Sequence, residues 1–116
     1  MNYEEMSDKH LSKLVAESIW LTVGDNLSML RNNSSATVHD GDGYWLEFSI
    51  NNPADVWLII FENKITTEWC FDDDWRATVD NQFQAGAFNR FQSFSKNPLR
   101  AAAIVFLKMK DAEKSR

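Results

Sequence analysis

An alternation of apolar and polar side chains at every second position runs through residues 44–50. This two-residue period is typical of a β-strand with one buried face. The positions expected to face the core are Tyr44, Leu46, Phe48 and Ile50, and the opposite face holds Trp45, Glu47 and Ser49. The pattern therefore predicts a half-buried strand that carries one large aromatic side chain, Trp45, on its polar face.

The same period returns in residues 65–71 and again from residue 75. The apolar positions of these two stretches are Ile65, Thr67, Trp69 and Phe71, followed by Trp75, Ala77 and Val79. The polar break between them, Asp72, Asp73 and Asp74, has the length of a hairpin turn. We therefore expect two antiparallel strands with Trp69 in the core. Residues 80–96, which set Phe83, Phe88, Phe91 and Phe94 among polar residues, predict a long irregular segment.

A helical spacing of apolar residues begins after Ser7. Ser7 is a good N-cap, and Asp8 places a negative charge in the first turn, where the helix dipole favours it. The apolar side of this segment consists of Leu11, Leu14, Val15 and Ile19. Ser18 interrupts it, and its hydroxyl can bond back to the carbonyl one turn earlier. We expect a helix that stops near residues 24–26, followed by an exposed loop over residues 27–43 that could hold a short strand.

Both prolines of the chain follow asparagine, and both pairs precede an apolar run. Asparagine caps helix N-termini and proline suits the first helical position, so Asn52-Pro53 and Asn97-Pro98 predict two helix starts. The first helix should run over residues 53–62 and the second over residues 98–111, with Asn63 able to adopt the left-handed turn after the first. Six consecutive apolar residues in the first helix imply burial nearly all round.

Together these elements predict an α+β domain over residues 1–116, in the order helix, strand, helix, strand, strand, helix. A small antiparallel sheet of about three strands should pack against the three helices. A chain of 116 residues is long enough for one domain with a single core.

The net charge of −5 is unevenly distributed, because residues 1–58 carry 3 basic and 9 acidic groups. Binding to a nucleic-acid backbone needs a basic surface, so nucleic acid is not expected as a partner. The longest apolar run is far shorter than the roughly 20 residues of a membrane span, and the acidic start does not resemble a signal peptide. The single cysteine, Cys70, cannot form an internal disulfide. A cytoplasmic protein is expected.

Few residues suggest a catalytic or metal-binding role. The acidic turn at Asp72, Asp73 and Asp74, with Asp40 and Asp42, could bind a divalent cation, but the spacing does not match a calcium loop. A solvated hairpin, or a surface that meets basic groups of a partner, explains the same residues. Neither histidine belongs to a recognisable motif, and a nucleophilic pair of Cys70 and His39 has no support in the spacing. No catalytic group, metal or cofactor is expected.

Trp45 is the aromatic residue with the clearest alternative roles, because it shares its face with Glu47 and Ser49. On an open face it would be an interface anchor. If another layer or residues 80–96 cover that face, Trp45 is structural.

Two blocks of the chain, NNPADVWLIIFENKIT at residues 51–66 and NPLRAAAIVFLKMKD at residues 97–111, resemble the paired hallmarks of the NinX-like family of small phage and prophage proteins. The segment SDKHLSKLVAESI at residues 7–19 is similar to the first helix of that family. The chain departs from the family pattern at Leu58, where a proline is often found, so a longer helix is expected here. The resemblance implies a phage or prophage setting and carries over no catalytic residues.

The preferred function is that of a non-enzymatic, acidic phage accessory protein that binds another protein, such as a host factor. The residues expected to contact this partner are Asp72, Asp73, Asp74, Trp45, Glu47, Asp40 and Asp42. Two alternatives stay open: an immunity protein that covers the basic active site of a toxin nuclease, and a metal-dependent hydrolase. A binding protein should present a flat or convex acidic face with exposed aromatics, whereas an enzyme should hold convergent polar groups in a pocket.

Overall fold

The computed structural model describes residues 2–19, 22–24, 35–39, 45–70, 74–81 and 89–114. The helices in these ranges are a 3-10 helix η1 (Tyr3–Glu5) and the α-helices α1 (Asp8–Ser18), α2 (Pro53–Asn63) and α3 (Pro98–Lys114). The strands are β1 (Thr22–Gly24), β2 (Ser35–His39), β3 (Trp45–Ser49), β4 (Thr66–Trp69), β5 (Trp75–Asn81) and β6 (Asn89–Ser95). The predicted α+β class is confirmed.

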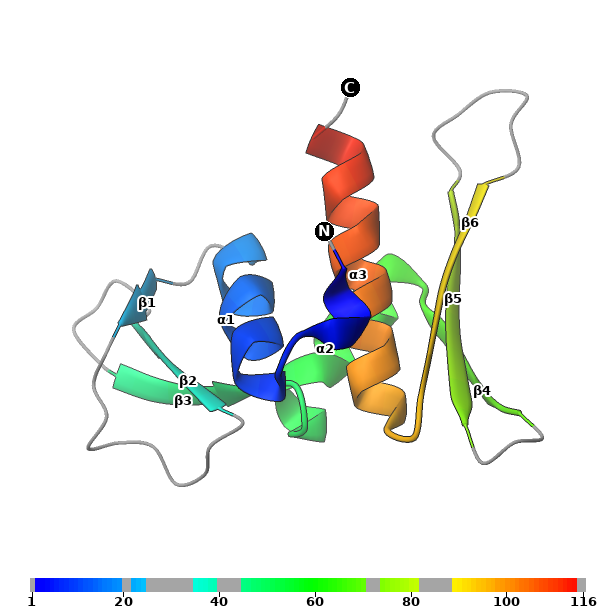
Figure 1. The fold of residues 1–116 in the computed structure, drawn as a ribbon. Helices are drawn as coiled ribbons and strands as arrows, with labels where there is room; N and C mark the ends of the chain where they lie inside the picture. The colour runs from blue at the N-terminus through cyan, green and yellow to red at the C-terminus, as the bar shows by residue number, and fades with distance from the viewer. Residues whose placement is uncertain are drawn as a thin grey trace.

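The strands form two antiparallel sheets, in the orders β1-β2-β3 and β4-β5-β6. Figure 1 shows the two sheets on opposite sides of α1 and α3. The first sheet packs on α1, the second packs on α3, and the two helices pack on each other. The predicted β4-β5 hairpin is therefore joined by a third strand, and β3 belongs to a separate sheet.

Helix α3 forms the centre of the core. Every residue from Ala101 to Leu107 is buried, because α1, α2 and the second sheet all contact this helix. Three consecutive alanines, at positions 101–103, let these neighbours approach the helix axis closely. The other largest buried side chains of the core include Leu11 and Val15 of α1.

All three predicted helix starts are confirmed. The hydroxyl of Ser7 accepts a hydrogen bond from the amide of His10 at 3.1 Å. The side-chain carbonyl of Asn52 accepts from Ala54 N at 3.1 Å, and that of Asn97 accepts from Leu99 N at 2.9 Å. The predicted back-bond of Ser18 is present as well, since its Oγ donates to the carbonyl of Leu14 at 2.9 Å.

Three details of the predicted secondary structure are wrong. Helix α1 ends at Ser18 and not near residues 24–26, because Gly24 pairs with Thr37 in the first sheet. The left-handed residue after α2 is Lys64, with φ 55° and ψ 43°, while Asn63 stays helical. Residues 89–95 are strand β6 and not irregular, since the full length of β5 pairs with them. The predicted short strand before residue 44 is present as β2, but residues 35–38 are buried, so the prediction that they belong to an exposed loop is wrong.

A polar network joins the starts of the three α-helices. Asn51, just before the cap of α2, donates from Nδ2 to Oδ2 of Asp8 at 3.0 Å. The side chain of Asn97, the cap of α3, donates to Asn51, and Arg100 pairs with the other oxygen of Asp8. These bonds fix α1, α2 and α3 to one another at one corner of the molecule.

Candidate functional site

Four of the seven residues predicted to contact a partner, Asp40, Asp42, Asp72 and Asp73, lie outside the described residues. Of the acidic turn the structure describes Asp74, whose backbone carbonyl accepts a hydrogen bond from Cys70 N at 2.8 Å. This bond extends the β4-β5 ladder toward the turn. The hairpin is thus confirmed, and binding by its carboxylates stays a prediction.

Trp45 and Glu47 are both partly covered by the neighbouring strand β2. The Trp45 ring lies 5.3 Å from the ring of its cross-strand partner His39, at an interplanar angle of 50°. Glu47 accepts a hydrogen bond from the hydroxyl of Ser35 at 3.1 Å. These contacts favour the structural interpretation of Trp45 over that of an open anchor.

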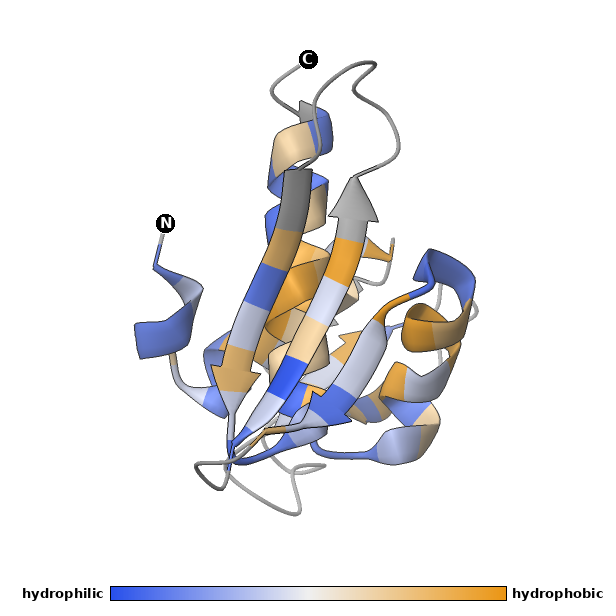
Figure 2. Cartoon of the chain, turned by 90° about the vertical axis from the view of Figure 1, so that its right-hand side faces the viewer, coloured by the Kyte–Doolittle hydropathy of each residue, from blue (hydrophilic) through white to orange (hydrophobic). Residues whose placement is uncertain are grey.

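The three most exposed large apolar side chains of the described residues lie together on α2. Trp57, Leu58 and Phe61 are 64%, 58% and 67% exposed. With the exposed Ala54 they occupy positions i, i+3, i+4 and i+7, which fall on one side of a helix. We call these four residues the α2 stripe. Figure 2 shows hydrophobic segments along α2.

The prediction that α2 is buried nearly all round is therefore wrong. Only Val56 and Ile59 are buried, and they lie on the side opposite the α2 stripe. The contact with α3 covers one side of the helix. The six apolar residues that suggested a fully buried helix thus serve two faces, one for the core and one toward solvent.

The α2 stripe is large for an exposed apolar surface. Fully burying a large aromatic side chain removes about 150–250 Å², so the three exposed side chains together present roughly 400 Å². Apolar patches of this size on monomers are often functional. Asp55 and Glu62, one heptad apart, lie along one edge of the stripe, and α2 contains no basic residue.

Other exposed apolar side chains are dispersed. Leu46 on β3 is 51% exposed and Trp69 on β4 is 56% exposed, so the prediction that both lie in the core is wrong. Each stands on an edge strand of its sheet. Trp69 packs edge-on against Trp75, with ring centroids 5.4 Å apart. Phe94 is 48% exposed and sits opposite Arg76 on the outer face of the second sheet.

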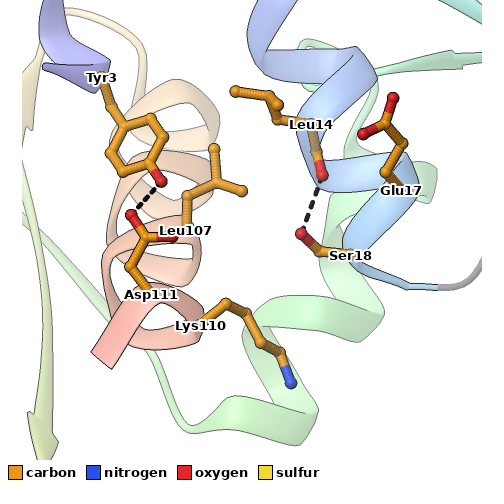
Figure 3. Close-up of a pocket in the computed structure, with 7 residues that line it drawn as sticks. All are labelled: Tyr3, Leu14, Glu17, Ser18, Leu107, Lys110 and Asp111. Atoms are coloured by element: carbon orange, nitrogen blue, oxygen red, sulfur yellow. Dashed lines mark hydrogen bonds between the residues drawn. The ribbon is translucent and has the colours of Figure 1, made fainter. Parts of the chain in front are cut away.

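A cleft of about 340 Å³ opens between α1 and α3. Figure 3 shows the residues that line it, which are Tyr3, Leu14, Glu17, Ser18, Leu107, Lys110 and Asp111. Tyr3 donates a hydrogen bond to the carboxylate of Asp111. Burial, and then the bond to Asp111 and its negative charge, raise the pKa of Tyr3 to about 12. A phenol held neutral in this way ties η1 to α3 and does not act as a base near pH 7.

Cys70 and His39, the pair considered for nucleophilic chemistry, both lie within the described residue ranges. In these ranges no group of three or more His, Cys, Asp or Glu side chains is placed to hold a metal ion. Cys70 follows β4 of the second sheet, whereas His39 ends β2 of the first. Within the same ranges, no helix combines the length and hydropathy that a membrane span needs.

A family model described as "Bacteriophage P22, NinX" matches residues 2–110. The chain belongs to this family. The match begins just before η1, ends at residue 110 within α3, and so includes both sheets and the α2 stripe. No curated protein matches the chain. Membership in this family makes the chain a phage accessory protein.

Proposed function

We propose that this NinX-family protein is non-enzymatic and acts by binding another protein through the α2 stripe. The observation that carries the proposal is the joint exposure of Trp57, Leu58 and Phe61 on one side of a helix whose other side is packed in the core. Leaving this much apolar surface in water is unfavourable, and large exposed patches are a usual mark of interaction sites.

The chemistry of the stripe favours a protein partner over other macromolecules. Tryptophan and other large aromatics are enriched among the residues that dominate protein interfaces. A helix that lies on a membrane surface is usually rich in lysine and arginine on its polar face, whereas α2 carries Asp55 and Glu62 there. The same carboxylates would repel a nucleic-acid backbone.

The test is co-purification from the host bacterium followed by mass spectrometry, with a variant that changes both Trp57→Ala and Phe61→Ala. We expect the double variant to lose the proteins that the natural chain retains, because its aromatic anchors are gone. Phe94→Ala is the matched control, since it removes an exposed aromatic ring from the second sheet. Retention of the same proteins by the double variant contradicts the proposal. A retained protein supports it only when, once purified, it binds the natural chain directly and the double variant weakly.

A further inference from the structure

We infer that the α2 stripe binds an apolar groove with a basic rim on a different protein, and that α2 lies lengthwise in this groove. This inference rests on the proposed function and specifies the partner that the stripe fits. It follows from three properties of α2: the spacing of its exposed residues, the sign of the charges beside them, and the area that they offer.

The spacing fits recognition of one helix face. Side chains at i, i+3, i+4 and i+7 are the anchors by which an amphipathic helix fills a hydrophobic groove. The eleven residues of α2 span about 16 Å, so Trp57 and Phe61, one turn apart, would occupy neighbouring pockets. The helix is already formed, because Asn52 caps its start, Lys64 ends it and α3 supports its inner side. A preformed helix loses little conformational entropy on binding.

The charges define the rim of the groove. Glu62 is exposed and follows Phe61 directly. Asp55 is half-buried and already accepts a hydrogen bond from the amide of Ser49 at 3.0 Å. Since the helix has no basic side chain of its own, the complementary rim carries lysine or arginine on the side that faces Glu62. The net charge of −5 adds a long-range attraction to such a partner.

A second copy of this chain fits the stripe poorly. Two stripes of roughly 400 Å² would bury about 800 Å² in total, below the roughly 1,200–2,000 Å² of stable interfaces. A two-fold axis repeats each contact in both directions. An antiparallel pairing centred on Leu58 would therefore place each Glu62 near Asp55 of the other copy, and like charges oppose this arrangement.

The experiment places a photo-crosslinking residue in the stripe, as Leu58→p-benzoylphenylalanine, in the host bacterium. The crosslinked protein is identified, the crosslinked position is mapped, and the partner is purified. Its Kd is then measured at several salt concentrations for the natural chain and for three variants. Trp57→Ala removes an anchor, Glu62→Lys reverses the charge at the edge, and Phe94→Ala is the control.

We expect Trp57→Ala to raise the Kd at least about tenfold. Glu62→Lys should also weaken binding and reduce its dependence on salt, because it places a positive charge against the basic rim. Phe94→Ala should leave the Kd within about twofold, as an exposed residue outside the interface does. Thermal unfolding of each variant verifies the fold, and a lysine near the C-terminus of a helix is favourable for the helix dipole.

Three outcomes overturn the inference in distinguishable ways. The first is a crosslink to a second copy together with a dimer in sedimentation equilibrium that Trp57→Ala abolishes. This result shows that the stripe binds a second copy of this chain. A different partner whose Kd is unchanged or lowered by Glu62→Lys refutes the basic rim but leaves the proposed function standing. Absence of a crosslink, or a partner that binds Trp57→Ala as tightly as the natural chain, refutes both the inference and the proposed function.

Discussion

Tyr3 is the residue that most clearly couples the two ends of the chain. The residue is 4% exposed, and its hydroxyl donates to Asp111 in the last turn of α3. A buried hydroxyl without a partner is unfavourable, and a hydrogen bond to a carboxylate is stronger than one between neutral groups. The contact therefore holds η1 against α3 and closes one side of the cleft between α1 and α3.

The raised pKa of Tyr3 predicts a loss of stability in alkali. The pKa of Tyr3 is about 12 in the folded protein against 10.0 for an ordinary tyrosine, so the folded state holds this proton more tightly than the unfolded chain. The stability that Tyr3 contributes through this difference in pKa is complete below about pH 10. It falls as the pH rises toward 12, by on the order of 2 kcal/mol. Urea unfolding of the natural chain and of Tyr3→Phe at pH 9 and pH 11.5 measures it. We expect the stability difference between the two proteins to shrink at the higher pH.

The control for this experiment is the phenylalanine variant itself, because every other titrating group is the same in both proteins. Effects of Tyr44, the lysines and the arginines therefore cancel in the difference. A difference that stays constant between the two pH values would show that Tyr3 does not titrate differently in the folded and unfolded states.

At the scale of elements, α2 and α3 have the same kind of N-terminal cap but lie in different environments. Each starts with an Asn-Pro cap and continues into an apolar run. Helix α3 is buried on every side from residue 101 to 107, whereas α2 has one side in water. The difference arises from their neighbours, since α3 lies between α1, α2 and the second sheet, and α2 is packed chiefly on α3.

This difference predicts opposite responses to added side-chain volume. Ala102→Leu forces three extra carbons into a fully packed site and should lower the free energy of unfolding by about 1–3 kcal/mol. Ala54→Leu adds the same group to the exposed side of α2 and should change it by less than about 0.5 kcal/mol. Urea unfolding of the two variants compares them directly. Similar losses in both would mean that the outer side of α2 is covered.

The same contrast explains which parts of the structure could be predicted from the sequence. Helix starts depend on a few adjacent residues, so Ser7, Asn52 and Asn97 identify them, and the β4-β5 hairpin follows from local alternation. Exposure depends on elements distant in sequence. Whether Trp57 or Trp69 meets solvent is decided by where α3 and the sheets end, and a local pattern contains no information about this.

Strand β6 illustrates a second reason for a missed element. Its residues are mostly asparagine, glutamine and serine, and its inward side chains include Ser93 and Phe91. Small polar side chains on a buried face weaken the apolar alternation on which strand prediction depends. Ser93 is 2% exposed because α3 lies against this face of the sheet, and a small residue leaves room for the helix.

At the scale of the whole molecule, Arg100 connects segments that lie almost a full chain length apart. Its guanidinium pairs with Asp8 of α1. It also donates from Nη2 to the carbonyl oxygens of Glu4 at 3.1 Å and Met6 at 2.8 Å. One side chain of α3 thus fixes both the N-terminal segment and the first turn of α1.

Arg100→Lys is therefore expected to be far from conservative. A planar guanidinium can serve a carboxylate and two carbonyls in different directions at once, whereas an ammonium on a flexible stem acts as a point charge. Leaving the partly buried carbonyl of Met6 without a donor should lower the free energy of unfolding by about 1–3 kcal/mol. Lys108→Met is the comparison, because it breaks the more exposed ion pair with Glu4 and should cost less than about 1 kcal/mol. Urea unfolding at pH 7 measures both. If Arg100→Lys lowers the free energy of unfolding as little as Lys108→Met does, the charge of Arg100, which the lysine keeps, holds the N-terminal segment on α3, and the geometry of its donors does not.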